Sequence, residues 1–111
     1  MHGFVNIVDR KKDVIKTGGE SVYSPEVEHA IYEHPAILEC AVFGRPDEHW
    51  GERVVAAVVL RPGQTVRPDE LIDFCRERMA AYKTPKQIVF MQSLPRTGSG
   101  KVQKRSLRDT T

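Results

Sequence analysis

The sequence predicts a single α+β domain in which two to three helices cover a small mixed sheet, preceded by a short two-stranded hairpin. Segments that begin with helix-start residues alternate with runs rich in β-branched residues, which indicates both element types in one domain. The run at 53–60 is apolar at most positions, as expected of a central strand buried on both faces. With 111 residues, of which 40% are hydrophobic, the chain is long enough for one modest core.

The N-terminal segment predicts the hairpin. Residues 4–8 have the pattern of a strand, a charged stretch follows at 9–13, and residues 14–15 resume a short apolar run. Gly18 and Gly19 break regular structure and end this unit. Because a natural protein rarely begins inside a strand, we expect the chain to be a fragment whose upstream neighbour is missing.

The middle of the chain predicts a helix and two strands. The Ser-Pro-Glu sequence at 24–26 supplies a capping oxygen, a proline at the first turn and an acid near the helix N-terminus, and Pro35 ends the helix. Residues 37–43 and 53–60 are rich in β-branched residues and predict strands. Residues 44–52 predict a loop that is longer than a hairpin turn, which suggests a role beyond connection.

The last part of the chain predicts a second helix, a strand and a basic C-terminal helix. The second helix begins near 68–70 and ends by 82–85. A strand follows at 87–91, and then a flexible loop rich in proline and glycine at 94–100. The short basic helix is expected from Lys101 onward.

Composition and charge exclude several functional classes. A net charge of +2 is too balanced to predict nucleic-acid binding, so no nucleic-acid partner is expected. Cys40 and Cys75 lie in apolar runs without metal-ligand spacing, so we expect reduced, buried thiols and no metal site. The sequence contains no transmembrane segment or signal peptide. We therefore expect a cytoplasmic setting, with peripheral membrane association of a longer parent protein left open.

The glycine-rich segment at 96–101 invites comparison with a phosphate-binding P-loop, and the comparison fails. A P-loop needs a glycine where Pro95 stands and a hydroxyl side chain where Val102 stands. What remains is Lys101 at the tip of a flexible glycine loop, a compact positive charge that can reach a phosphate held elsewhere.

Ordered signatures along the chain resemble those of the adenylate-forming superfamily, which includes acyl- and aryl-CoA synthetases, firefly luciferase and the adenylation domains of nonribosomal peptide synthetases. The signatures are DRKKDVIKTGGE at 9–20, SPEVE at 24–28, Pro46-Asp47 with Trp50-Gly51-Glu52, YKTPK at 82–86 and LPRTGSGK at 94–101. The resemblance implies that 1–111 is the small, mobile C-terminal domain, with a hinge near 9–13. It also implies a large N-terminal domain that lies outside this sequence.

The resemblance implies a reaction in two halves and a role for Lys101 in the first. In this family a carboxylate attacks ATP to give an acyl-adenylate and pyrophosphate, and a thiol then displaces AMP to give a thioester. Lys101 matches the lysine that lies between the substrate carboxylate and the α-phosphate during adenylation. ATP, CoA and Mg²⁺ are implied as ligands, bound mainly by the large domain, and a carboxylic acid is the other substrate. The chain alone is expected to be inactive.

The N-terminal signature implies further roles. Lys12 matches the hinge position, where a solvated charged turn suits a change of backbone angles. Arg10 is expected to contact AMP, and Lys16 matches a lysine that luciferase uses in its second half-reaction. Gly18 and Gly19 belong to the loop that lines the pantetheine tunnel, where glycine leaves no side chain to obstruct it.

The remaining signatures imply contacts with CoA. Trp50 and Tyr82 are expected as stacking surfaces and Lys86 as a phosphate contact, since aromatic planes beside a cation suit an adenine that carries phosphates. Glu20 is included in this CoA-binding set. Glu52 is interpreted instead as a structural hydrogen-bond partner of loop backbone. Some relatives have an arginine where Thr84 stands, so the pattern here departs from theirs.

Two other functions stay open on the sequence alone. The parent enzyme could load a carrier protein in place of CoA, because both thiols use the same pantetheine arm. The chain could also be a small non-enzymatic binding module whose basic end docks an acidic partner or RNA. The feature behind that alternative is a cluster of four cations: Lys101, Lys104, Arg105 and Arg108.

Overall fold

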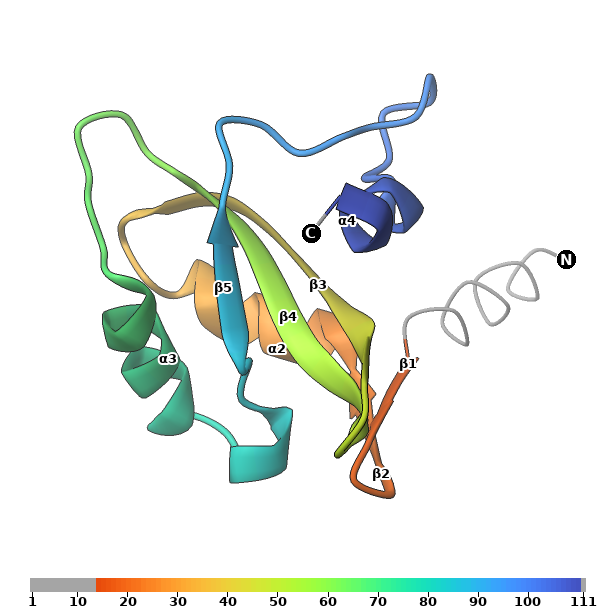
Figure 1. Ribbon diagram of the computed structural model, residues 1–111. Coiled ribbons are helices and arrows are strands. Elements are labelled where there is room, and N and C mark those ends of the chain that lie inside the picture. The colour runs from red at the N-terminus through yellow and green to blue at the C-terminus, as the bar shows by residue number, and fades with distance from the viewer. Residues whose placement is uncertain (1–13, 111) are drawn as a thin grey trace, which may run out of the picture.

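The computed structural model describes residues 14–110, with side chains through residue 108. Its elements, in chain order, are β1 (Val14–Thr17), β2 (Glu20–Tyr23), α2 (Ser24–Tyr32), β3 (Ile37–Asp47), β4 (Gly51–Leu60), α3 (Pro68–Arg76), the 3-10 turn η1 (Ala81–Lys83), β5 (Gln87–Phe90) and α4 (Lys104–Thr110) (Figure 1). The predicted α+β class, with a hairpin before a mixed sheet, is confirmed. Within the described part, no helix is both long enough and apolar enough to cross a membrane.

Strand β4 is the centre of the sheet, as the apolar run predicted. It pairs antiparallel with β3 over most of its length, parallel with β5, and antiparallel with β1 at one end. Alternate residues of β4 enter two different cores, with Val54 and Val58 on one face and Val55 and Val59 on the other. Both faces of β4 are therefore buried, which explains why its sequence does not alternate with polar residues.

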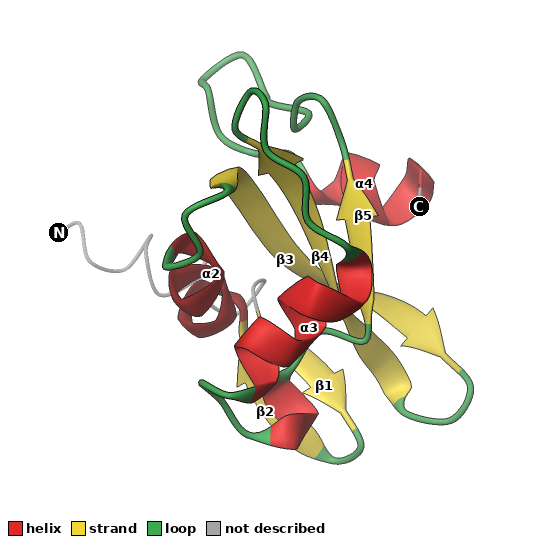
Figure 2. Cartoon of the chain, turned by 90° about the vertical axis from the view of Figure 1, so that its left-hand side faces the viewer, coloured by secondary structure: helices red, strands yellow, loops and turns green. Residues whose placement is uncertain are grey.

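The helices divide between the two faces of the sheet (Figure 2). Helices α2 and α3 cover one face, where Val27, Ile31 and Leu71 join the larger core. Helix α4 covers the other face, where Leu107 belongs to a second, smaller core together with Phe43. Cys40 and Cys75 are buried free thiols in the larger core, as predicted.

The hairpin is formed by different strands from the predicted ones. Its strands are β1 and β2, which pair from Val14↔Tyr23 to Thr17↔Glu20, and Gly18 and Gly19 form the turn between them. These glycines have φ of +58° and +84°, as a two-residue hairpin turn of the I′ kind requires. The strand predicted at residues 4–8 lies outside the described residues.

The predicted loop at 44–52 is wrong. Strand β3 continues to Asp47 and β4 starts at Gly51, so only residues 48–50 are unpaired. Pro46 is accommodated because β3 is an edge strand, where a missing N–H leaves no gap in the ladder. Gly44 and Pro46, which are typical loop residues, are therefore paired strand residues here.

Helix boundaries show smaller differences. Ser24 is the first residue of α2, and Tyr23, without a side-chain hydrogen bond, holds the N-cap position that was predicted for Ser24. Helix α3 begins at Pro68 as predicted, and the Glu70 carboxylate accepts a hydrogen bond of 2.8 Å from the Arg67 N–H. The C-terminal helix begins at Lys104, three residues later than expected, because residues 96–102 form a separate turn.

Candidate functional site

The glycine turn of the β1–β2 hairpin packs directly against Trp50. The Gly18 N–H donates a hydrogen bond of 2.8 Å to the Trp50 carbonyl oxygen. A Cβ atom on Gly18 would lie 3.0 Å from the Trp50 ring, and the positive φ already disfavours any side chain there. Gly19, by contrast, has no atom within 4 Å of such a Cβ. Glycine is therefore required at Gly18 by both conformation and contact, and at Gly19 by conformation alone.

The carboxylate of Asp47 fixes the turn that carries Trp50. Its Oδ1 accepts hydrogen bonds from the N–H groups of His49 and Trp50, at 2.8 Å and 3.0 Å. The hydrogen bonds from Trp50 and His49, with Arg53 nearby, hold the pKa of Asp47 below its ordinary value. This is an Asx turn, in which a short side chain replaces backbone partners at the tip of a hairpin.

A pocket of about 220 Å³ lies between the two hairpin tips and η1. We call it the Trp50 pocket, and its lining residues are Thr17, Gly18, Glu20, Trp50, Ala81, Tyr82 and Lys86. The side chains of Trp50 and Tyr82 are 41% and 38% exposed, so both rings can accept a ligand. The predicted CoA-binding residues therefore come together in one place, with Gly19 the exception.

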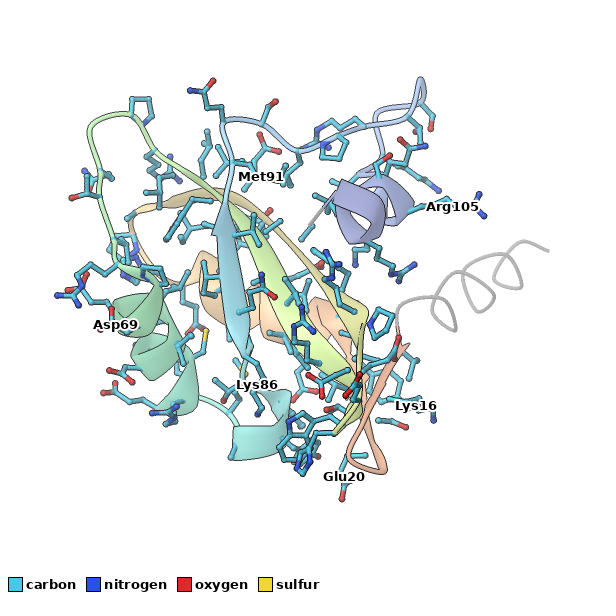
Figure 3. The ribbon with its side chains drawn as sticks, viewed as in Figure 1. Lys16, Glu20, Asp69, Lys86, Met91 and Arg105 are labelled. Atoms are coloured by element: carbon cyan, nitrogen blue, oxygen red, sulfur yellow. The ribbon has the colours of Figure 1, made fainter. Side chains whose placement is uncertain are left out.

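The Lys86 ammonium supplies a positive charge to this pocket. It lies 5.3 Å from the centroid of the Trp50 ring, within the range of a cation–π contact. Figure 3 shows Lys86 and Glu20 at the same end of the sheet. The Lys86 N–H donates to the Val54 carbonyl oxygen at 2.8 Å, which fixes the start of β5 beside β4.

The turn η1, which carries Tyr82, is held by an ion pair with α2 and by a hydrogen bond within its own segment. Lys83 Nζ lies 2.7 Å from a carboxylate oxygen of Glu26. That hydrogen bond raises the pKa of Lys83. Thr84 is buried, and its hydroxyl donates to the Ala80 carbonyl oxygen at 3.2 Å. Thr84 therefore stabilises the turn and does not line the pocket.

Lys16 and Glu52 lie on the flank of the same hairpin. The Lys16 side chain is exposed and its ammonium donates to the Ser21 hydroxyl at 2.7 Å, so it does not line the Trp50 pocket. The Lys16 backbone N–H donates to Glu52 Oε1 at 2.8 Å. Glu52 is therefore a structural hydrogen-bond partner of backbone, as interpreted, but the backbone belongs to strand β1 and not to a loop.

Lys101 lies in a hydrogen-bonded turn at the opposite end of the sheet. The Thr97 N–H donates to the Lys101 carbonyl oxygen at 2.8 Å, and the Gly100 N–H donates to the Thr97 carbonyl oxygen at 2.9 Å. Arg96 and Val102 form an isolated antiparallel bridge at the base. The segment predicted as a flexible loop is therefore closed into a small hairpin, here called the Lys101 turn (residues 96–102), and the Lys101 side chain is exposed on it.

The Arg96 guanidinium connects the Lys101 turn to the sheet. One of its nitrogens donates to a carboxylate oxygen of Glu39 on β3. Another donates to the Gly100 carbonyl oxygen at 2.9 Å, immediately before Lys101. The sequence did not point to this connection, because Arg96 and Glu39 are 57 residues apart. Asp47, in contrast, comes immediately before the turn at 48–50, a position where aspartate is a recognised local signal of an Asx turn.

A basic groove of about 860 Å³ lies between the Lys101 turn, α2, β3 and α4. Its lining cations are Arg96, Lys101, Lys104, Arg105 and Arg108. Figure 3 places Arg105 on α4, away from the Trp50 pocket. The Glu28 carboxylate lies 3.0 Å from the Lys104 ammonium and accepts the Val42 N–H at 2.8 Å, which ties α4 to the edge of β3.

The groove and the Trp50 pocket share no lining residue. Figure 1 shows the Lys101 turn and the β1–β2 hairpin at opposite ends of the domain. The described part of the domain therefore carries two separate polar sites. Arg10 and Lys12, the predicted AMP contact and the predicted hinge residue, lie outside the described residues. Among residues 14–110, no group of three or more side chains suitable for binding a metal is present.

Comparison with known proteins identifies the family of this domain. Residues 26–101 match the family model of the AMP-binding enzyme C-terminal domain. The probable CoA ligase CCL11 of Humulus lupulus is 50% identical over 109 residues, covering 96% of this chain and 19% of the relative. The 2-methylpropanoate–CoA ligase CCL4 of the same plant is also 50% identical, covering 96% and 20%.

Solved structures show the same fold. The structure of ATP-bound MatB from Rhodopseudomonas palustris superimposes with a TM-score of 0.87 at 39% identity, covering 90% of this chain and 20% of that one. This chain spans about a fifth of the length of the curated relatives that it matches. It belongs to the family of AMP-binding enzyme C-terminal domains.

Proposed function

We propose that this chain is the mobile C-terminal domain of an ATP-dependent acyl- or aryl-CoA ligase. In this proposal the Lys101 turn serves adenylation, and the β1–β2 hairpin with the Trp50 pocket serves thioester formation. Family membership supports the proposal, as do relatives whose names describe CoA ligases and a relative solved with ATP. A large N-terminal domain, joined through the hinge at Lys12, would hold the carboxylic acid, ATP and Mg²⁺.

The Trp50 pocket is the observation that carries the proposal for CoA. Two exposed aromatic rings lie beside the ammonium of Lys86, next to a glycine turn. An adenine can stack on Trp50 or Tyr82, while Lys86 attracts a phosphate attached to it. A carrier protein delivers the same thiol on a phosphopantetheine arm that has no adenine. The pocket therefore favours CoA over a carrier protein as the acceptor.

The chemistry assigned to Lys101 is electrostatic. Negative charge builds up on the oxygens of the α-phosphate as the carboxylate attacks and pyrophosphate leaves. An ammonium on the exposed Lys101 turn would stabilise that charge more in the transition state than in the ground state. Mg²⁺, when bound by the large domain, would neutralise further phosphate charge. Lys101 itself forms no covalent bond and keeps its proton throughout.

A comparison of the two half-reactions tests the proposal in a full-length ligase that carries this domain. Lys101→Ala is expected to slow acid-dependent ATP–pyrophosphate exchange about 100- to 1,000-fold, by analogy with removal of other electrostatic stabilisers. The same variant should convert a supplied acyl-adenylate and CoA into thioester at an almost unchanged rate. Trp50→Ala should show the reverse pattern, since it removes a surface for CoA alone.

The matched control is Arg76→Ala. Arg76 is an exposed cation on α3 whose partner is Asp73 on the same helix, and it lies in neither site. Its removal should leave both half-reactions unchanged. If each of the variants Lys101→Ala and Trp50→Ala slows both half-reactions equally, the assignment of the Lys101 turn to adenylation and of the Trp50 pocket to thioester formation is contradicted. Pyrophosphate release from ATP and a fatty acid by the 111-residue chain alone would contradict its predicted inactivity.

The structure gives less support to a non-enzymatic binding module with a basic end. Glu28 pairs with Lys104 and Glu39 pairs with Arg96, so acidic side chains offset part of the positive charge along the groove. Nucleic-acid binding by the chain with a steep salt dependence would favour that alternative. Weak nucleic-acid binding that does not depend on the Lys101 turn would not favour the binding-module alternative.

A further inference from the structure

The backbone of Lys16 is oriented away from its hairpin partner. In a two-residue hairpin the pair that closes the turn, here Thr17↔Glu20, exchanges backbone hydrogen bonds, and the pairs then alternate. Lys16↔Ser21 is consequently a pair without such bonds. The N–H of Lys16 therefore faces β4, and β2 cannot satisfy it.

On the β4 side, a side chain takes the place of a strand carbonyl. Thr17↔Gly51 is the register pair that joins β1 to β4. Glu52 Oε1 accepts the Lys16 N–H at 2.8 Å. On the other side of the same pair, the Gly18 N–H donates to the Trp50 carbonyl oxygen at 2.8 Å. The hairpin is thus attached at two points that flank its junction with β4.

Gly44 makes room for the Glu52 carboxylate. A Cβ atom on Gly44 would lie 3.0 Å from Glu52 Oε2 and 3.0 Å from Cγ2 of Ile15. The φ of Gly44 is not in the left-handed region, so conformation alone does not require glycine at this position. A side chain at Gly44 would crowd the Glu52 carboxylate and the Ile15 methyl group, so at least one of them would have to shift. The half-buried carboxylate therefore lies between the Lys16 N–H on β1 and Gly44 on β3.

We propose that Glu52 is a positioning residue for the second half-reaction. By accepting the Lys16 N–H it fixes the flank of the hairpin, and through that flank the position of Gly18 against Trp50. The inference rests on the proposed function, because it assumes that this hairpin and the Trp50 pocket serve CoA. Glu52 does not line the pocket, so it acts through the backbone of Lys16 and not on the ligand.

Substitutions that separate hydrogen-bond acceptance from charge test this role. In a full-length ligase carrying this domain, Glu52→Ala is expected to lower kcat/KM for CoA about tenfold, as loss of one charge-assisted hydrogen bond would do. Adenylation, followed by ATP–pyrophosphate exchange, should stay unchanged. Glu52→Gln keeps an acceptor oxygen of the same reach and should stay within about twofold of the wild type. Glu48→Ala removes a neighbouring exposed acid and serves as the matched control.

Two further measurements separate positioning from general stability. In the 111-residue chain, amide hydrogen exchange at Lys16 should become faster in Glu52→Ala and stay protected in Glu52→Gln. Gly44→Ala places a methyl group against the Glu52 carboxylate and should displace it. This variant should therefore reproduce the kinetic effect of Glu52→Ala although residue 52 itself is unchanged. A structural defect alone would instead slow both half-reactions together.

The outcomes distinguish the inference from the proposed function. An unchanged kcat/KM for CoA in Glu52→Ala, equal loss in both half-reactions, or a glutamine variant as poor as the alanine variant would each overturn the inference. If Trp50→Ala impairs the CoA step and Glu52→Ala does not, the inference alone fails. If Trp50→Ala leaves the CoA step intact, the assignment of the hairpin to CoA fails, and the inference fails with it.

Discussion

The ammonium of Lys86 lies 5.3 Å from the centroid of the Trp50 ring, although the two residues come from different strand ends of the sheet. The contact joins the β3–β4 turn to the segment that leads into β5. Gly18 approaches the same ring from the β1–β2 hairpin. One aromatic side chain is therefore in contact with two further segments, and the Trp50 pocket depends on all of them.

The first prediction concerns the contribution of Trp50 to recognition of adenine. Trp50→Ala should raise the KM for CoA about tenfold, as expected for loss of one base–aromatic stacking contact. The same variant should use pantetheine, which has no adenine, about as well as the wild type does. The measurement is the ratio of kcat/KM for CoA to that for pantetheine in a full-length ligase. Trp50→Phe keeps a smaller ring and should retain most of the preference. An unchanged ratio in Trp50→Ala would show that Trp50 does not contact adenine.

The second prediction compares the two turn glycines. Gly19→Ala introduces a positive-φ alanine into open space and should lower the free energy of unfolding by about 1 kcal/mol. Gly18→Ala adds a methyl group at 3.0 Å from the Trp50 ring and should lower it further. Urea unfolding of the chain measures both values. Gly98→Ala, where a Cβ meets nothing within 4 Å, is the control. Equal losses for Gly18→Ala and Gly19→Ala would contradict a close contact with Trp50.

Patterns that depend on neighbouring residues predicted much of this fold. Helix α3 could be predicted from its Pro-Asp-Glu start alone, because helix starts have a recognisable composition. Strand β4 could be predicted from its apolar run, because a strand buried on both faces lacks alternating polar residues. The loop predicted at 44–52 failed for the opposite reason. Whether Pro46 breaks a strand depends on whether that strand lies at a sheet edge, and strand order is a property of the whole sheet.

The residues of the candidate site also differ in whether a local sequence pattern could predict them. Ordered signatures resembling a known family identified Lys101, Trp50, Tyr82 and Lys86, and the last three share one pocket. The residues that hold them in place were not identified, with Glu52 as the exception. The contact between Arg96 and Glu39 spans 57 residues, and no local pattern of charge records such a pair.

The third prediction concerns the thiols of Cys40 and Cys75. Burial raises the pKa of Cys40 to about 12 and that of Cys75 to about 11, because the apolar core disfavours a thiolate. At pH 8 the native chain should react with a disulfide reagent at least about a hundredfold more slowly than the urea-unfolded chain, since the thiolate is the reactive form. Both thiols should react once the chain unfolds. A native rate within tenfold of the unfolded rate would contradict the buried, reduced state.

The fourth prediction concerns the support that Arg96 gives to the Lys101 turn. Arg96→Ala removes the donor to the Gly100 carbonyl oxygen and the partner of Glu39, so the ammonium of Lys101 should be held less accurately. Adenylation is expected to slow about tenfold, because misplacement of a catalytic group by a small distance is costly, while the CoA step stays unchanged. Arg96→Lys can keep one partner but not both, and should be intermediate.

A double-mutant cycle with Glu39→Gln provides the check on that pair. If Glu39 acts by holding Arg96, the two substitutions together should slow adenylation little more than Arg96→Ala does alone. Fully additive effects on the adenylation rate would show that the two residues act independently. Arg76→Ala again serves as the control for removal of an exposed arginine.

The fifth prediction is a dependence of stability on pH that originates at Asp47. Hydrogen bonds from the Trp50 and His49 N–H groups lower the pKa of this carboxyl below its ordinary value of 3.8. A carboxyl whose pKa is lower in the folded state contributes stability above its unfolded pKa and loses it as pH falls through the folded value.

Urea unfolding of the chain, followed by Trp50 fluorescence, should therefore show a stability difference between the wild type and Asp47→Asn at pH 6. Asparagine keeps the acceptor oxygen without the charge, so this difference should shrink as pH falls below about 4. Asp47→Ala, which removes the acceptor as well, should stay less stable than the wild type even at the lower pH. A difference between the wild type and Asp47→Asn that does not change from pH 6 to pH 3 would contradict this account of the turn.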